Sequence, residues 1–256
     1  MSNILLLSPS PIAAVAASRG SGAANLATRS PKEVWADGAV GTAATIDIDL
    51  GAAVAVDTVY LGYVSPPAAG ATWTITGGAA GYADQVLKAS GALRAIDTAS
   101  RSPTRTHAFW TGTAATVRYI RLSVTQPAGS ASLSAGIVMA GRAWRPTFNM
   151  EFGAGRRVID TGTVAALPDG GFSTIEGARK REFNWTLGDL SIAEADALEE
   201  LLLDHGESAP LLVVSDPDAT TGQRARIHYG LFVGLKAFER ENPAQTKQQF
   251  VFEEWV

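Results

Sequence analysis

Short runs of alternating apolar and polar residues, each closed by glycine or proline, recur through residues 45–144. In the first run Ile46, Ile48 and Leu50 alternate with two aspartates, and Gly51 follows. Because successive side chains of a strand point to opposite faces of its sheet, this run predicts a strand with one buried face that ends at Gly51. No strongly helical pattern separates the runs, which indicates an antiparallel β-sandwich.

Further runs of the first half have the same character. They predict strands at residues 59–63, 73–75, 115–125 and 133–144. A strand is also expected at residues 3–8, followed by a loop. The apolar stretch that begins there is superficially similar to a secretory signal, but no basic residue precedes it, and Pro9 and Pro11 would break a helix. A first strand is therefore the favoured interpretation.

The second half combines strands with one helix. Ser191 and Glu194 have the spacing of a capping box, and Gly206 is suited to end the helix. Its apolar face, expected to be buried, consists of Ile192, Ala195, Leu198, Leu201 and Leu202. Strands are predicted at residues 149–152, 157–161, 182–187, 210–215, 226–238 and 248–255.

The two halves differ in charge. Residues 1–145 hold 11 basic and 7 acidic side chains, a net charge of +4, whereas residues 146–256 hold 10 basic and 18 acidic side chains, a net charge of −8. They meet at Arg145-Pro146, where a predicted strand runs into a proline. A chain of 256 residues is also long enough for two domains. We therefore predict two domains, residues 1–145 and residues 146–256.

Composition and motifs exclude several classes of function. The absence of cysteine excludes disulfides, thiolate metal sites and cysteine nucleophiles. The motifs of α/β-hydrolases, zinc proteases and P-loop proteins are absent. No basic cluster is longer than Arg179-Lys180-Arg181, and no stretch has the ~20 apolar residues of a membrane helix. We expect a protein that is not an enzyme, uses no cofactor, binds no specific nucleic acid and does not insert into a membrane.

The order of motifs in the first half resembles the discoidin-like (galactose-binding-like) jelly roll, and more narrowly the version found in phage tail proteins. The motifs are Asn25-Leu26, Val34-Trp35, Ile46-Asp47-Ile48-Asp49-Leu50-Gly51, Val56-Asp57, Ala71-Thr72-Trp73 and Arg118-Tyr119-Ile120-Arg121. The resemblance covers about residues 1–145. It implies a jelly-roll β-sandwich and assigns Trp35 to the core.

Many proteins with this fold bind sugars or lipid head groups through loops at one end of the sandwich. The candidate glycan-binding residues are Arg29, Lys32, Arg105, His107 and Trp110, since aromatic rings stack on sugar rings and basic side chains donate to hydroxyls. The alternative for Trp110 is a strand residue half buried against the core. The loops have few acidic residues, so we expect no calcium site and no other metal.

The element order of the second half resembles the tail-tube-like domain of siphophage tail proteins, in which six copies close a ring. The supporting residues are Phe183-Asn184-Trp185-Thr186-Leu187, the helix from Ser191, Pro210-Leu211-Leu212 and residues 250–255. Distal tail proteins usually place the ring domain first, whereas here it comes second, so a minor tail protein is equally compatible.

Together the resemblances imply a structural virion protein of the phage tail tip or baseplate, made in the host cytoplasm. Its expected partners are further copies in a hexameric ring, the tail tube, hub and tape measure proteins, and host-surface glycans. The alternative function is that of a carbohydrate-binding module.

Overall fold

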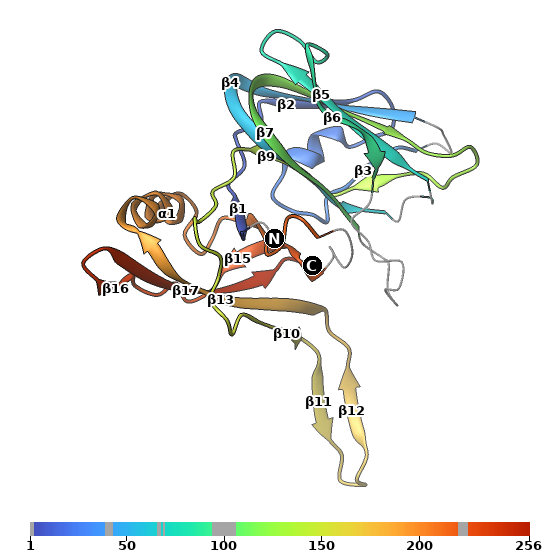
Figure 1. Ribbon diagram of the computed structural model, residues 1–256. Coiled ribbons are helices and arrows are strands. Elements are labelled where there is room, and N and C mark those ends of the chain that lie inside the picture. The colour runs from blue at the N-terminus through green and yellow to red at the C-terminus, as the bar shows by residue number, and fades with distance from the viewer. Residues whose placement is uncertain (1–2, 39–42, 66–67, 69, 94–105, 220–224) are drawn as a thin grey trace. The chain divides into compact units, whose positions relative to one another are not determined.

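The computed structural model describes residues 3–38, 43–65, 68, 70–93, 106–219 and 225–256. Within them the chain is mainly β with antiparallel sheets and one α-helix (Figure 1). The predicted fold class, a jelly-roll sandwich followed by β-structure with one helix, is confirmed. The chain forms two compact units, each with most of its residue contacts inside itself. The first unit consists of Met1–Arg145 and Val213–Ile227, and the second unit consists of Pro146–Leu212 and His228–Val256.

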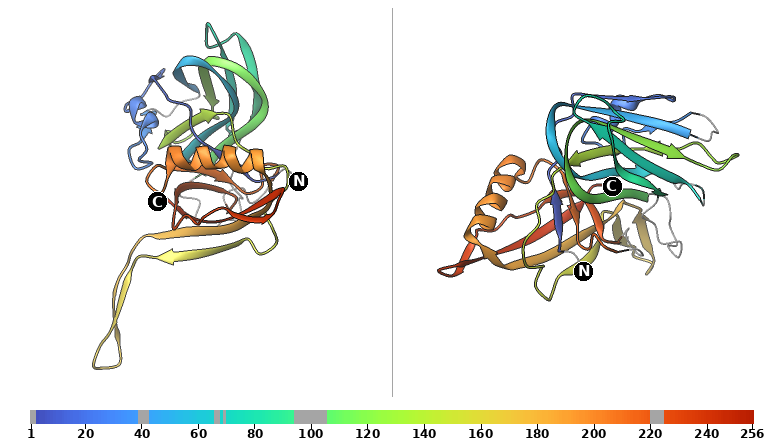
Figure 2. Two further views of the ribbon diagram at one scale, coloured as in Figure 1. Left: turned by 90° about the vertical axis from the view of Figure 1, so that its left-hand side faces the viewer. Right: turned by 45° about the horizontal axis from the view of Figure 1, so that its top comes forward.

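A six-stranded sheet dominates the first unit. Its order is β2-β4-β7-β5-β6, and β9 also pairs with β4, while β3 and β8 form a two-stranded sheet. The long strands β4 and β7 curve through the unit (Figure 2). The elements are β1 (Leu5–Leu7), β2 (Ala14–Ala17), the 3₁₀ helix η1 (Ala23–Ala27), β3 (Trp35–Ala36), β4 (Ala43–Val64), β5 (Thr72–Gly78), β6 (Gln85–Ala92), β7 (Thr106–Thr125), β8 (Ser134–Ala135) and β9 (Ile137–Gly141).

Strand β4 is longer than the alternation predicted. Ile46 and Ile48 are buried as expected, but the prediction that the strand ends at Gly51 is wrong. Gly51 has a positive φ of 77°, and the pairing of β4 with β7 shifts register between Asp49 and Val54. A bulge accommodates the extra residues, so the two predicted runs form one continuous strand.

The core of the first unit lies between these sheets and includes two tryptophans. Trp35, which the jelly-roll resemblance assigns to the core, is fully buried, and its indole nitrogen donates to the carbonyl oxygen of Arg19 at 3.2 Å. Trp73 is also buried. Other members of this core are Leu26, Ile46, Ile48, Val59, Leu61, Ile75, Val117, Ile120 and Leu122. Burial of each such side chain contributes roughly 1.5–3 kcal/mol, so this apolar set supplies the main driving force for folding of the unit.

The second unit carries one sheet and the helix. Its elements are β10 (Gly155–Asp160), β11 (Thr163–Ala166), β12 (Phe172–Ile175), β13 (Arg179–Ser191), α1 (Ile192–His205), β15 (Ile227–Phe232), β16 (Glu239–Asn242) and β17 (Gln245–Glu254). Strand β14 (Leu211–Val214) lies where the chain passes from the second unit to the first. In the strand order of its sheet, β10, β13, β17 and β15 are successive neighbours, and β16 pairs with β17. Strands β11 and β12 form a separate two-stranded hairpin.

Helix α1 begins and ends as predicted. Both hydrogen bonds of the Ser191–Glu194 capping box are present, and Gly206 ends the helix with a positive φ of 53°. The buried side chains are Ala195, Leu198 and Leu202. The expectation that Ile192 is buried is wrong, because its side chain lies in the first turn and is 46% exposed.

Three other predicted boundaries are corrected. Residues 149–152 are not a strand, since Phe152 and Gly153 form a turn. Strand β15 ends at Phe232 rather than at residue 238, because Gly234 takes a positive φ of 60°. The strand predicted at residues 157–161 begins earlier, at Gly155. The β11–β12 hairpin was not predicted, because its apolar residues show no alternation with one buried face.

Candidate functional site

One face of the first unit's sheet gathers two tyrosines and two arginine–aspartate pairs. In the register of β4 and β7, Asp47 lies opposite Arg121 and Asp49 lies opposite Tyr119. Their chain neighbours Ile46, Ile48, Ile120 and Leu122 are buried, so the polar residues occupy the solvent side of the sheet. We call this surface the tyrosine–arginine face, formed by Asp47, Asp49, Tyr82, Arg118, Tyr119 and Arg121.

Each arginine of the tyrosine–arginine face binds one aspartate through two parallel hydrogen bonds. Arg121 donates from Nε and Nη2 to the two carboxylate oxygens of Asp47, both at 2.6 Å. Arg118 donates likewise to Asp49, at 2.9 and 3.0 Å. Bidentate pairs fix the plane of both groups. The hydrogen bond from Arg118, followed by one from the Gly51 amide, lowers the pKa of Asp49 to about 2, so this carboxylate stays ionised.

The two tyrosine rings lie beside each other and next to the guanidinium groups. The ring centroids of Tyr82 and Tyr119 are 5.1 Å apart, with the planes tilted by 58°. The guanidinium carbon of Arg121 is 5.1 Å from the Tyr82 ring centroid, and that of Arg118 is 4.8 Å from the Tyr119 ring centroid. These are cation–π distances, and they hold the rings in place.

The loop that carries Tyr82 is fixed by hydrogen bonds. Asp84 accepts from the amides of Ala80 at 3.2 Å and Gly81 at 2.9 Å, and the Thr76 hydroxyl donates to the carbonyl oxygen of Tyr82 at 2.7 Å. A Cβ at Gly78 would lie 2.1 Å from a carboxylate oxygen of Asp84, so a larger residue there would displace the Asp84 side chain. These hydrogen bonds therefore fix the backbone of the loop at Tyr82.

The tyrosine–arginine face suits a ligand rich in hydroxyl groups. Aromatic rings provide apolar surface for the C–H face of a sugar, carboxylates accept hydrogen bonds from hydroxyls, and guanidinium groups donate to ring and hydroxyl oxygens. The arginine side chains are 38% and 36% exposed, so ligand atoms can reach them. Two arginines and two aspartates balance in charge, which favours an uncharged ligand over a strongly charged one.

The structure places the predicted glycan-binding residues on separate segments. Arg29 and Lys32 are exposed and follow η1, and Arg105 lies outside the described residues. His107 and Trp110 belong to β7. His107 is 9% exposed, and its Nδ1 lies 2.8 Å from the Tyr60 hydroxyl. Trp110 is half-buried and packs against the core, as the alternative interpretation has it. The assignment of these five residues to a glycan-binding site remains a prediction.

The tyrosine–arginine face was not predicted, although five of its six residues lie in the motifs of residues 46–51 and 118–121. The aspartates alternate with Ile46 and Ile48, and Tyr119 and Arg121 belong to the second motif. The sequence shows two acidic and two basic side chains beside the alternating apolar residues of these motifs. This pattern could have indicated that the four charged side chains share one face of the sheet. Tyr82 could not be predicted from the sequence, because the loop that carries it lies next to the other residues of the face only in the folded chain.

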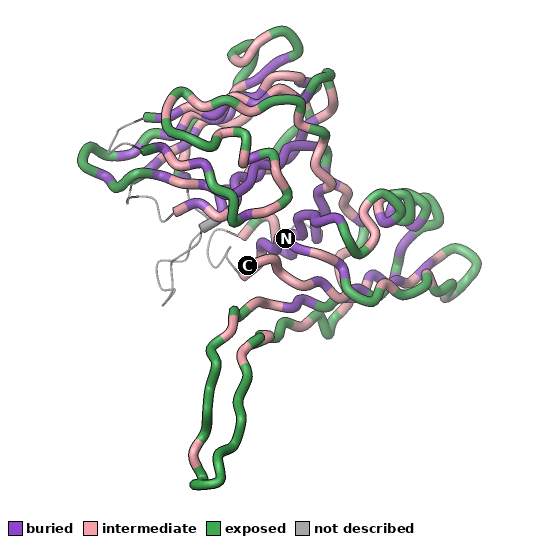
Figure 3. Tube along the Cα trace, turned by 180° about the vertical axis from the view of Figure 1, so that it is seen from behind, coloured by how far each residue is buried: buried purple, intermediate pink, exposed green. Residues whose placement is uncertain are grey.

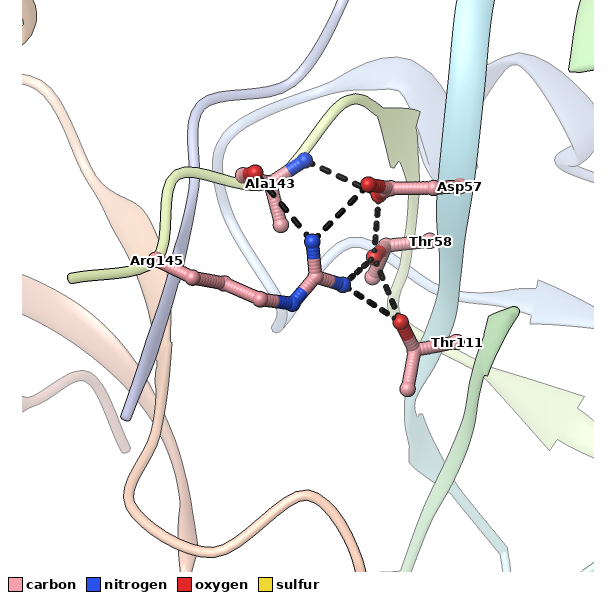
Figure 4. Close-up of polar contacts among 5 residues, drawn as sticks. All are labelled: Asp57, Thr58, Thr111, Ala143 and Arg145. Carbon is pink, nitrogen blue, oxygen red and sulfur yellow. Dashed lines mark hydrogen bonds and ion pairs between the residues drawn. The ribbon is translucent and has the colours of Figure 1, made fainter. Parts of the chain in front are cut away.

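A second polar cluster, at the junction of β4 and β7 with the end of the first unit, is structural (Figure 4). The guanidinium of Arg145 donates to Asp57 at 2.8 Å and to the Thr111 hydroxyl at 2.6 Å. Asp57 also accepts from the Ala143 amide at 3.0 Å and from the Thr58 hydroxyl at 2.7 Å. Since the Asp57 side chain is only 9% exposed and its bonds are satisfied internally, this cluster holds chain segments together rather than binding a ligand.

The described residues contain no group of three or more His, Asp or Glu that could hold a metal ion. Within the same residue ranges, no helix has the length and apolar character needed to cross a bilayer. The expectations of no metal, no cofactor and no enzymatic activity stay predictions.

No family model matches the chain, and no curated protein matches it. Solved structures match about half of it. Chitosan-binding module 1 of a chitosanase/glucanase from Paenibacillus sp. IK-5 is 18% identical, with a TM-score of 0.38, over 52% of this chain and 97% of that chain. The CBM32 of AlyQ in complex with 4,5-unsaturated mannuronic acid is 23% identical, with a TM-score of 0.36, over 52% and 98%.

A third match is a structure of reduced XRCC1 bound to the catalytic domain of DNA polymerase β, which is 12% identical, with a TM-score of 0.41, over 52% of this chain and 97% of that chain. At these identities the likeness concerns the fold alone and does not bear on what this chain binds. None of the three is a phage tail protein, so the resemblance to tail proteins stays a prediction.

Proposed function

We propose that this protein binds carbohydrate through the tyrosine–arginine face of its first unit. The observation that carries the proposal is the placement of Tyr82 and Tyr119, with ring centroids 5.1 Å apart, between two bidentate arginine–aspartate pairs on one solvent-facing side of a sheet. Preorganised donors and acceptors lose little conformational entropy on binding, which favours recognition of a weakly interacting sugar.

The charge balance of the face narrows the class of sugar. Because Arg118 and Arg121 are each neutralised by an aspartate, the face offers no unpaired cation for a uronic acid or a phosphate. The ligand we propose is therefore a neutral saccharide, bound by stacking and by hydrogen bonds to its hydroxyl groups.

The test is a glycan array that includes neutral and acidic saccharides, probed with the full chain and with a variant that carries Tyr82→Ala and Tyr119→Ala. We expect the full chain to bind neutral glycans on the array and the double variant not to bind them. A Trp110→Ala variant is the control for the alternative site. Loss of signal with Trp110→Ala but not with the tyrosine variant would assign binding to that other site.

A second candidate function is that of a structural component of a larger assembly. It is favoured by the exposed apolar residues of the β11–β12 hairpin, among them Phe172, whose side chain is 71% exposed. Exposed apolar surface of this kind marks contact with another protein. The assembly that the sequence resemblances imply is a phage tail tip, where this chain would form a homohexameric ring and contact the tube, hub and tape measure proteins.

The two candidates are compatible, because they use different units of the chain. A tail-tip protein whose first unit binds a neutral glycan would take part in recognition of the host surface. The test of the assembly role is the mass of the full chain in solution by light scattering coupled to size-exclusion chromatography. A mass of six copies supports the hexamer, and a monomer over the whole accessible concentration range contradicts the assembly role.

A further inference from the structure

The β11–β12 hairpin projects from the sheet of the second unit as an arm (Figures 1 and 2). We define the arm as residues 161–178. Its residues are exposed along nearly its whole length (Figure 3). Val164 and Phe172, which are 69% and 71% exposed, lie on the same face in the strand register. The arm thus presents an apolar face that nothing in its own unit covers among the described residues.

An arm of this composition is poorly suited to water. It contains only two charged residues, Asp169 and Glu176, and its two strands form a sheet of their own. A lone two-stranded hairpin is marginally stable in water at best. Covering the face of Val164 and Phe172 with protein would add the apolar burial that the hairpin lacks.

The same unit contains a pocket of about 470 Å³ at the ends of β15 and β17. Its apolar wall consists of Leu231, Phe232, Val233, Trp255 and Val256, and its rim is polar. Lys180 and Glu253 form an ion pair at this rim. A pocket of this size and lining accepts an aromatic or branched apolar side chain.

The arm of one molecule cannot fill its own pocket. Thr161, at the base of the arm, lines the pocket, and the turn at Gly170 lies nine residues further along the chain, roughly 30 Å away at ~3.3 Å per residue. The arm extends away from the sheet to which the pocket belongs (Figure 1). An arm that docks into this pocket would therefore belong to another molecule.

We infer that the arm of a second copy of this chain docks into the pocket, with Phe172 as the inserted side chain. The inference rests on the assembly role proposed above and names its contact. An arm that meets a pocket elsewhere on the same chain makes a head-to-tail contact, in which every copy uses both surfaces. Such contacts close into a ring or continue as a filament.

The test begins with two variants of the full chain, Phe172→Asp on the arm and Val233→Asp in the pocket. Val233 is 39% exposed, so an aspartate there does not disturb the core. We expect the wild type to be oligomeric and each variant alone to be monomeric by light scattering. The matched control is Phe148→Asp, which changes an aromatic residue 60% exposed outside the arm and should leave the oligomer intact.

Mixing the two variants tests the head-to-tail geometry. One variant keeps an intact pocket and the other an intact arm, so an equimolar mixture should form dimers and nothing larger. A mixture that stays monomeric would contradict the inferred docking. An oligomeric wild type whose mass neither substitution lowers would also contradict it, while leaving the assembly role in place. A wild type that is monomeric at every concentration tested would contradict the assembly role itself.

Cysteine crosslinking locates the contact. Because the chain has no cysteine of its own, every disulfide of a variant with Phe172→Cys and Val233→Cys joins two introduced cysteines, and peptide mapping identifies the 172–233 link. We expect oxidation to give covalent oligomers, and Phe148→Cys with Val233→Cys to give none. Equal crosslinking of both pairs would place Phe172 outside the pocket.

Discussion

The Arg145 guanidinium donates a hydrogen bond of 2.8 Å to the carboxylate of Asp57, which lies 88 positions earlier in the chain. The pair joins the last residue of the 1–145 segment to the middle of β4, and Thr58 and Thr111 extend it onto β7 (Figure 4). A buried carboxylate is tolerated here because Arg145, the Ala143 amide and the Thr58 hydroxyl all donate to it.

Replacement of Arg145 by alanine should destabilise the first unit. It leaves the nearly buried Asp57 without its counter-ion, which we expect to cost about 2–3 kcal/mol of unfolding free energy. Chemical denaturation monitored by tryptophan fluorescence measures this cost. Arg142→Ala, at an exposed position nearby, is the control and should change the free energy by less than about 0.5 kcal/mol. Equal costs for both variants would show that the cluster contributes nothing specific.

The same pair predicts a sensitivity to acid. Burial of the Asp57 carboxyl raises its pKa, but hydrogen bonds from Arg145, Ala143 and Thr58 outweigh this, so the pKa lies below the ordinary value of 3.8. A carboxyl whose pKa is lowered in the folded state stabilises the fold above 3.8, and that contribution is lost as the pH falls through the folded-state pKa. Asp57→Asn should therefore melt below the wild type at neutral pH, with a difference that narrows under acid conditions. A constant difference at all pH values would contradict this.

The buried face of α1 gives a third prediction. Leu198 is fully buried, whereas its neighbour Glu199 is exposed. Leu198→Asp places an unpaired charge in the core and should cost about 3 kcal/mol or more. Glu199→Ala should cost less than about 0.5 kcal/mol. Thermal unfolding of the two variants measures the difference, and similar melting temperatures would show that the helix is oriented differently.

The domain boundary gives a fourth prediction. The core cluster of the first unit begins at Leu26 and does not include Ile4 to Leu7, although these four residues are buried. In the strand order β1 neighbours β14, which a fragment of residues 1–145 would lack. We expect residues 9–145 to fold as a monomer and residues 1–145 to self-associate through the uncovered strand. Circular dichroism and light scattering of both fragments test this, and an unfolded 9–145 fragment would contradict the proposed independence.

The sequence predicted the parts of the fold that local pattern determines. Ile46 and Ile48 marked the buried face of β4, and the capping box marked the first turn of α1. It did not predict that β4 continues past Gly51, because a glycine with positive φ can either end a strand or sit in a bulge, and only pairing with β7 decides between them. The arm was missed because its apolar residues face solvent.

The candidate site was harder to predict than the fold. Asp47 and Arg121 are 74 positions apart in the chain and meet only through strand register. The loop residue Tyr82 joins them because Asp84 fixes its loop. The predicted residues Arg29, Lys32, Arg105, His107 and Trp110 were instead derived from a resemblance to proteins that bind ligands at loops. Local sequence alone does not show which of the two surfaces binds a ligand.

The most direct test of carbohydrate binding is a calorimetric titration of one neutral glycan into four proteins, the wild type and the Tyr119→Ala, Arg121→Ala and Trp110→Ala variants. Removal of a stacking ring or of a bidentate arginine should weaken binding at least about tenfold, a loss of about 1.4 kcal/mol, whereas Trp110→Ala should bind as the wild type does. Thermal unfolding of each variant confirms that it is folded. Unchanged affinity in the folded Tyr119→Ala and Arg121→Ala variants would contradict binding at the tyrosine–arginine face.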